Sequence, residues 1–161
     1  MTSQNFDGPG FFSVRDAFIL GENNLAPEAA VPSLAVDTNA LSLATGGSVN
    51  FDLDAGLANA GRRYQLVGTL SGASPGTVLP GGANSIPINF DPVAAQILAL
   101  SGTSTFSNFD GTLDANGQAT ATLNAPSPLP ASLAGAHLDF AYTLVGPFDF
   151  QSHTVWVQVG P

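Results

Sequence analysis

From residue 33 onward, apolar and polar residues alternate in short runs that are separated by turn-forming residues. The clearest run is SVNFDLD (48–54), in which Val49, Phe51 and Leu53 are separated by polar residues. Successive side chains of a β-strand point to opposite faces, so each such run has one face for a core and one for solvent. This period of two predicts an all-β fold.

The same pattern recurs along the chain and predicts a set of short strands. Their ranges are 33–37, 40–44, 48–54, 63–72, 86–90, a hairpin of 105–114 with 117–124, and a pair of 137–145 with 153–159. Short strands with polar outer faces are typical of a β-sandwich, so we predict a single antiparallel β-sandwich over residues 33–161, Ig-like or fibronectin III-like. Two brief helices are expected, at 91–100, where Pro92 suits the first helical position, and at 130–135.

Residues 1–32 differ from this pattern and form a predicted N-terminal arm and linker. Within the arm, FFSVRDAFIL (11–20) exposes too much apolar surface to remain in water. We predict that it adds a strand to a sheet edge, either its own or that of a neighbouring copy. The predicted docking residues are Phe11, Phe12, Val14, Phe18, Ile19 and Leu20.

Charge is scarce and one-sided in this chain. It has twelve acidic residues, three Arg and no Lys, which leaves a net charge of −9. Nucleic acid and anionic membranes require a cationic surface, so both are excluded as expected partners, and no stretch is long enough for membrane insertion. Sheet edges are commonly protected by Lys and other charges, so their scarcity favours self-association. There is no Cys, which rules out disulfides and thiol chemistry.

Four stretches resemble a family of β-rich modules in secreted proteins of environmental bacteria. They are LSLATGGSVNFDLDAGLANAGRRYQLVG, SGASPGTVLPGG, FDGTLDANGQATATLNAP and LAGAHLDFAYTLVGPFDFQSHTVWVQV. The resemblance runs from about residue 33 to residue 159 and does not include the arm. It implies an extracellular or cell-surface location with no agreed activity. No signal peptide is visible, so we expect it to have been removed or replaced.

One motif suggests hydrolysis. The stretch Gly72-Ala73-Ser74-Pro75-Gly76 matches the G-x-S-x-G of a nucleophile elbow, which needs a helix directly after the serine. Pro75 and Gly76 favour a turn instead. We therefore predict that the protein is not an enzyme.

Polar residues near the end of the chain form a candidate ligand site. A hairpin turning at Gly146-Pro147 would place His153 opposite Phe140 and on the other face from Asp139. His137 and Asp139 would share a face, with Trp156 opposite His137. Two His are too few for a zinc or copper site, so a polar patch beside Trp156 is the simpler interpretation.

Calcium is the one metal that the carboxylates suggest. Asp52 and Asp54 lie on the solvent face of one predicted strand, although Ca²⁺ needs six to eight oxygen ligands. The stretch around Asp114 and Gly117 resembles part of a calcium loop, but neither register of the loop fits, and a turn with positive φ at Asn116 or Gly117 is predicted. No other cofactor is expected.

Together these features favour a non-catalytic extracellular structural or adhesive module, a subunit that self-assembles into a filament or surface layer through strand exchange by its arm. The alternative is a module that binds carbohydrate, such as a surface glycan, or calcium.

Overall fold

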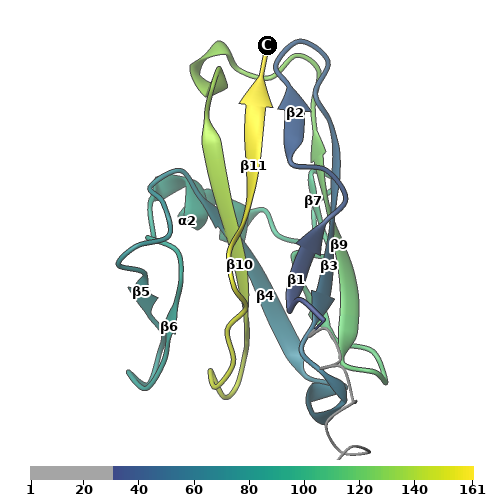
Figure 1. Cartoon of the computed structure of the whole chain (residues 1–161), viewed down its shortest axis with the longest axis vertical. Helices are drawn as coiled ribbons and strands as arrows, with labels where there is room; N and C mark the ends of the chain where they lie inside the picture. The colour runs from purple at the N-terminus through teal and green to yellow at the C-terminus, as the bar shows by residue number, and fades with distance from the viewer. Residues whose placement is uncertain (1–30) are drawn as a thin grey trace, which may run out of the picture. The chain divides into compact units, whose positions relative to one another are not determined.

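The computed structural model describes residues 31–161. The chain divides into two compact units, Met1–Val31 and Pro32–Pro161. The predictions made for the arm, including a strand formed by Phe11, Phe12, Val14, Phe18, Ile19 and Leu20, lie outside the described residues. The second unit is all-β apart from short helical segments (Figure 1).

Two main sheets and one small hairpin make up the second unit. The four-stranded sheet has the order β1 (Leu34–Val36), β3 (Gly47–Asp54), β9 (Gln118–Ala125), β7 (Phe106–Ser107). The five-stranded sheet has the order β2 (Ala40–Ser42), β11 (Val155–Gly160), β10 (His137–Leu144), β4 (Arg63–Thr69), β8 (Asp110–Thr112). The hairpin pairs β5 (Thr77–Val78) with β6 (Ser85–Ile86).

The main core lies between the inner faces of the two sheets. Phe51 of β3 packs against Phe140 of β10, with ring centroids 4.8 Å apart, and against Phe109 at 5.6 Å. All three side chains are fully buried, as are Val49 and Leu53. The alternation in SVNFDLD therefore identified the core face of β3 correctly, and the two sheets form a sandwich.

The prediction of a purely antiparallel sandwich is wrong at one pair of strands. β2 pairs with β11 in parallel, with Leu41 beside Val159, so the five-stranded sheet is mixed. Alternation of apolar and polar residues shows which face of a strand is buried and carries no information about its direction. The sequence pattern therefore could not distinguish this pair from an antiparallel one.

The predicted hairpin of 105–114 with 117–124 is also only partly correct. β7 pairs with β9, but β8 pairs with β4 in the other sheet, so the chain crosses between the sheets at Phe109. Phe109 is fully buried, and its carbonyl accepts a hydrogen bond from the Leu66 amide at 2.7 Å. Burial of this aromatic ring in the core, together with that bond, fixes the crossing.

The predicted turn before β9 is confirmed. The Gly117 amide donates to the Asp114 carbonyl at 3.1 Å, and Gly117 has a φ of 81°. The Asp114 Oδ1 accepts from the amides of Asn116 and Gln118. These bonds lower the pKa of Asp114 below its usual value, the bond from Gln118 being the largest cause. The turn connects strands of different sheets.

The first predicted helix is confirmed as α2 (Pro92–Ala99), with Asp91 as its N-cap. α2 and the β5–β6 hairpin pack on the outer face of the five-stranded sheet and form a second, smaller core with it. Its fully enclosed members are Val67, Ile86, Ile88, Ala94 and Ala141. The second predicted helix is only a 3₁₀ turn, η2 (Ala131–Leu133); another, η1 (Leu57–Asn59), precedes β4.

Candidate functional site

Asp52 and Asp54, the predicted calcium ligands, belong to a ladder of polar side chains on the outer face of the four-stranded sheet. Asp52 lies opposite Thr120 and accepts from its hydroxyl at 3.2 Å. Asp54 lies opposite Gln118; its Oδ2 accepts from the Gln118 side-chain amide at 2.8 Å, and its Oδ1 from the amide of Gly56 at 2.9 Å. These bonds explain both carboxylates as cross-strand contacts that define the register of β3 and β9.

The ladder continues through Asn50 to the loop after β1. Both carboxylate oxygens of Asp37 accept from Asn50, one from its main-chain amide at 2.9 Å and one from its side-chain amide at 2.7 Å. The main-chain bond from Asn50 is the largest cause that holds the pKa of Asp37 below its usual value. Within residues 31–161, no three His, Cys, Asp or Glu side chains converge as a metal site would require. The geometry does not favour calcium here.

Ser74 lies in a turn between β4 and β5 and has no helix behind it. Asn89 organises this turn: its side-chain amide donates to the carbonyls of Ser71 and Ser74, and its Oδ1 accepts from the Gly76 amide at 3.0 Å. The segment therefore has the structure of a turn held by one asparagine and lacks the strand-turn-helix context of a nucleophile elbow.

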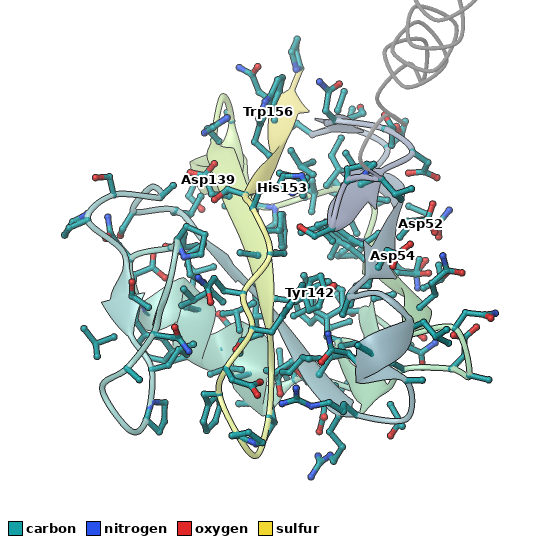
Figure 2. All side chains as sticks on the ribbon, turned by 60° about the horizontal axis from the view of Figure 1, so that its bottom comes forward. Asp52, Asp54, Asp139, Tyr142, His153 and Trp156 are labelled. Atoms are coloured by element: carbon teal, nitrogen blue, oxygen red, sulfur yellow. The ribbon has the colours of Figure 1, made fainter. Side chains whose placement is uncertain are left out.

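The predicted ligand residues His137, Asp139 and Trp156 do come together, on the outer face of the five-stranded sheet. Trp156 of β11 pairs with Asp139 of β10 (Figure 2). The His137 ring lies against the Trp156 ring, with centroids 5.2 Å apart and planes inclined by 37°. Trp156 is 43% exposed, which is a high value for the largest aromatic residue.

The strand register that produces this cluster differs from the prediction. We expected Trp156 opposite His137, whereas His137 lies opposite Gln158, two residues further along. The shift arises in two places. At the turn, Thr143 bridges Gln151 rather than Phe150, which displaces the pairing by one residue. A second residue is gained before Val155, where the Tyr142 amide donates to the Ser152 hydroxyl at 2.9 Å and the Ser152 amide donates to the Tyr142 carbonyl. A count from the Gly146-Pro147 turn assumes regular pairing and cannot include these irregularities.

His153 is not part of the cluster's hydrogen bonding. The prediction that His153 would lie opposite Phe140 is wrong, because Phe140 pairs with Val155. The His153 Nδ1 instead lies 2.9 Å from the Ser33 hydroxyl, ahead of β1. This contact ties the connection before β11 to the beginning of the described chain.

Asp139 differs from the other carboxylates because it is buried without a close partner. The residue is 8% exposed, and its side chain has no hydrogen bond to any of the described residues. The His137 imidazole lies beside it, but its Nδ1 is 3.8 Å from Oδ2, too far for a hydrogen bond. Among residues 31–161, the one fully buried side-chain polar atom without a hydrogen bond is the Tyr142 hydroxyl, so the Asp139 oxygens keep some contact with solvent and stay available as acceptors.

The two arginines of the described residues, Arg62 and Arg63, form ion pairs away from His137, Asp139 and Trp156. Arg62 forms an ion pair with Asp149, and Arg63 donates to both carboxylate oxygens of Asp110 at 2.9 and 3.0 Å. Both pairs are at least partly exposed and contribute little to stability. They do, however, leave no free guanidinium among residues 31–161 to attract an anionic ligand.

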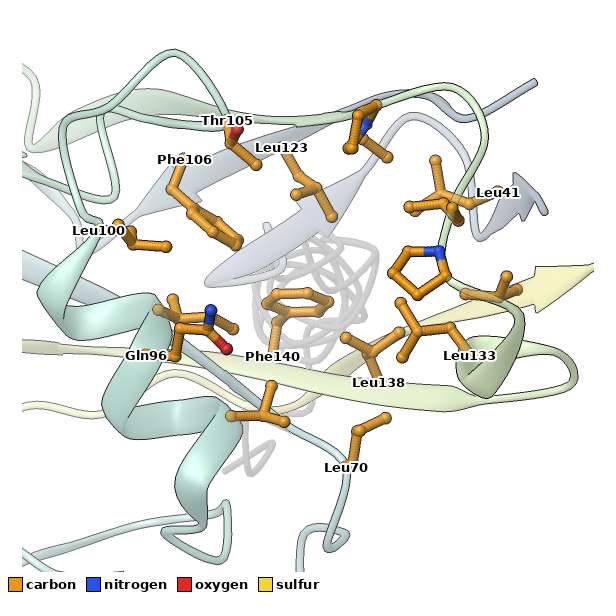
Figure 3. A pocket seen from close by; sticks show the side chains of 17 residues that line it. Leu41, Leu70, Gln96, Leu100, Thr105, Phe106, Leu123, Leu133, Leu138 and Phe140 are labelled. Atoms are coloured by element: carbon orange, nitrogen blue, oxygen red, sulfur yellow. The ribbon is translucent and has the colours of Figure 1, made fainter. Parts of the chain in front are cut away.

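An apolar groove, which the sequence analysis missed, opens between the two sheets (Figure 3). Its volume is about 330 Å³. α2 forms one wall and the η2 segment the other, while β9 and β10 contribute from the two sheets. Only Gln96 and Thr105 bring polar side chains to it; Leu70 and Leu100 are more than one-third exposed, and Leu133 is partly buried at the opposite wall. No sequence motif marks an opening whose lining comes from separate elements.

Comparisons with known proteins identify no family. No family model matches the chain, and no curated protein matches it. Among solved structures, it is similar to a DUF4466 family protein from Parabacteroides merdae, with 14% sequence identity and a TM-score of 0.31. The match covers 82% of this chain and 44% of that protein, so the chain spans less than half of its length. Similarity at this level supports no inference about fold or function.

No helix among residues 31–161 is long and apolar enough to cross a membrane.

Proposed function

We propose that the chain is a non-catalytic, extracellular structural or adhesive module of Ig-like or fibronectin III-like character. It assembles when residues 11–20 of one copy, the docking segment, insert into the apolar groove of another copy. The observation that carries this proposal is the groove itself, an opening in the core between the sheets that is lined almost entirely by apolar side chains.

The chemistry of the docking segment matches that of the groove. FFSVRDAFIL contains six large apolar residues and only two charged residues, Arg15 and Asp16. A groove of about 330 Å³ is within the usual range of ligand pockets, at its lower end, and takes a few large side chains rather than the whole segment. An extended segment places alternate side chains in such a groove while its main chain remains available to pair with a strand.

The position of β1 allows exchange between copies. Gly47, at the beginning of β3, pairs with Ala125, which lines the groove; Leu53, near the end of β3, pairs with Leu34 of β1. An eight-residue strand spans roughly 27 Å, so the chain enters β1 at the far end of the sandwich from the groove. The twelve residues of linker span roughly 40 Å when extended, which is enough to reach the groove of the same copy or that of a second copy.

The energetics predict assembly that depends on concentration. Full burial of one Phe, Ile or Leu side chain contributes about 1.5–3 kcal/mol, so three such residues contribute roughly 5–9 kcal/mol. Association itself costs about 4 kcal/mol or more. A reciprocal exchange closes as a dimer, whereas a head-to-tail exchange continues as a fibre, and we propose the head-to-tail form.

The test is light scattering coupled to size-exclusion chromatography of the full chain over a range of concentrations, with electron microscopy of the same samples. Ile19→Asp places a charge in the docking segment, and Leu100→Glu places one at the rim of the groove, where Leu100 is 37% exposed. The control is Val78→Glu, because Val78 is 67% exposed and does not line the groove.

The wild type and Val78→Glu should form large assemblies or filaments as the concentration rises, while Ile19→Asp and Leu100→Glu should stay monomeric. A wild type that is monomeric at every concentration contradicts the proposal. Assembly that survives both substitutions contradicts it equally, because the contact must then lie elsewhere.

A further inference from the structure

We propose that Trp156, Asp139 and His137 form a binding site for a neutral pyranose sugar on the outer face of the five-stranded sheet. This inference is independent of assembly through the docking segment. It rests on an exposed aromatic ring and a buried carboxylate that lie side by side on paired strands.

Trp156 supplies an apolar surface of the size of a sugar ring. It is 43% exposed although it is flanked by paired strands, and the His137 ring packs against it at 5.2 Å. The His137 contact restricts the indole to one orientation, so less conformational freedom is lost when a ligand stacks on the remaining exposed surface. The C–H face of a pyranose is apolar and packs well on such a ring.

Asp139 supplies the polar recognition. Its carboxylate is largely enclosed and accepts no hydrogen bond within residues 31–161, so it keeps unused acceptor capacity next to the indole. Two neighbouring hydroxyl groups of a sugar donate to the two oxygens of one carboxylate, and such charge-assisted bonds are stronger than neutral ones. A ligand with hydroxyl donors thereby satisfies a group that the protein leaves without a partner.

Charge selects the class of sugar. The chain carries a net charge of −9, and Arg62 and Arg63 are engaged with Asp149 and Asp110. A sugar with carboxylate or sulfate groups would be repelled by Asp139 and would find no free guanidinium there. The site therefore fits an uncharged hexose unit of a polysaccharide and disfavours acidic polysaccharides.

Trp156 is the only Trp of the chain, so its fluorescence reports directly on the site. The full-length protein is titrated with cellohexaose and mannohexaose as neutral probes, with oligogalacturonate as an acidic probe and tetramethylammonium as a cationic one. At least one neutral hexasaccharide should change the emission saturably, with a Kd on the order of 1 mM or below, as expected for a small exposed site. Oligogalacturonate should not.

Calorimetry with matched variants tests the residue assignment. Trp156→Ala and Asp139→Asn should each weaken binding of the responsive sugar about tenfold, because they remove the stacking surface and the charged acceptor respectively. The control is Phe90→Ala, which removes an aromatic side chain that is 54% exposed on the segment before α2 and should bind as the wild type does.

Three results overturn the inference: no neutral hexasaccharide changes the emission, the Trp156→Ala variant binds with unchanged affinity, or only tetramethylammonium gives a saturable response. The last would show a site for organic cations instead. Ile19→Asp, which tests assembly, should bind the sugar as the wild type does, so failure of one proposal is distinguishable from failure of the other.

Discussion

The outer faces of the two sheets differ in how their polar side chains are hydrogen-bonded. On the four-stranded sheet, each polar side chain of β3 lies opposite a polar partner on β9 and is hydrogen-bonded to it. The pairs are Ser48 with Asn124, Asn50 with Thr122, Asp52 with Thr120, and Asp54 with Gln118. On the five-stranded sheet, α2 and the β5–β6 hairpin cover an apolar centre, and Asp139 beside it has no such partner.

This difference separates carboxylates that stabilise the fold from one that is available to a ligand. Asp52 and Asp54 were predicted as calcium ligands because both are acids on one strand, but each accepts a hydrogen bond from a side chain of β9. The sequence suggested that Asp139 belongs to a polar surface patch. In the structure it is more enclosed than Asp52 and Asp54, and unlike them it accepts no hydrogen bond within residues 31–161. Partner geometry, rather than the number of acids, therefore distinguishes these carboxylates from one another.

The largest expected effect comes from the turn that starts the polar ladder. Gly117 has a φ of 81°, and a Cβ there would lie 2.0 Å from the Gly56 carbonyl oxygen. Gly117→Ala should lower the free energy of unfolding by about 3 kcal/mol, measured by urea denaturation, because backbone strain and a backbone clash add. In the matched control Gly102→Ala, φ is 84° but nothing lies within 4 Å, so only about 1 kcal/mol should be lost. Equal losses would show that the approach to Gly56 is not important.

A smaller effect is expected at the cap of the helix that covers the other face. Burial alone would raise the pKa of Asp91, but bonds from the Ala94 amide and the Thr69 and Ser71 hydroxyls outweigh it and lower the pKa to about 2. Asp91→Ala should cost about 2 kcal/mol of stability at pH 7.

The pH dependence of that loss gives a second measurement. Because the folded pKa lies below the unfolded one, the contribution of Asp91 is present above pH 4 and is lost as the pH falls through 2. The difference between wild type and Asp91→Ala should therefore shrink in acid. A difference that stays constant from pH 7 to pH 2 would mean that the charge of Asp91 contributes nothing.

The smallest expected effect compares the two kinds of carboxylate directly. Asp139→Asn removes the charge of a largely enclosed carboxylate that accepts no hydrogen bond within residues 31–161, and it should raise the free energy of unfolding by up to about 1 kcal/mol. Asp52→Asn keeps a polar group opposite Thr120 and should change it by less than about 0.5 kcal/mol. Thermal melts of the two variants, with and without EDTA, provide the check. A loss of stability in Asp139→Asn would show that the carboxylate has a structural partner, and an EDTA-dependent melt would restore calcium as a candidate.

Much of the fold was predictable because it depends on local chemistry. Alternation located β3, β4, β10 and β11, since burial of one strand face imposes a period of two. Pro92 marked the start of α2, and Asn116-Gly117 the turn before β9, because the first helical position and positive φ have strong residue preferences.

The remaining features depend on contacts between distant segments. The bridge between Thr143 and Gln151 and the bond from the Tyr142 amide to the Ser152 hydroxyl together shift the register of β10 and β11, which no local pattern records. The crossing at Phe109 likewise depends on the packing of its ring against Phe51 and Phe140, which lie far away in the sequence. For the candidate site, the residue types His137, Asp139 and Trp156 were predictable, but the lack of a donor for Asp139 was not, because it depends on every neighbouring side chain.

The position of β11 has a consequence for how the domain folds during synthesis. β11 lies between β2 and β10, and β2 has no other strand partner in its sheet. The segment of residues 40–42 must therefore wait for residues 158–160, which are made more than one hundred residues later. Contacts of such long sequence separation slow folding, and a ribosome that has not released residue 160 holds a chain whose five-stranded sheet is incomplete. We expect the sandwich to form after synthesis of the whole domain, in one late cooperative step.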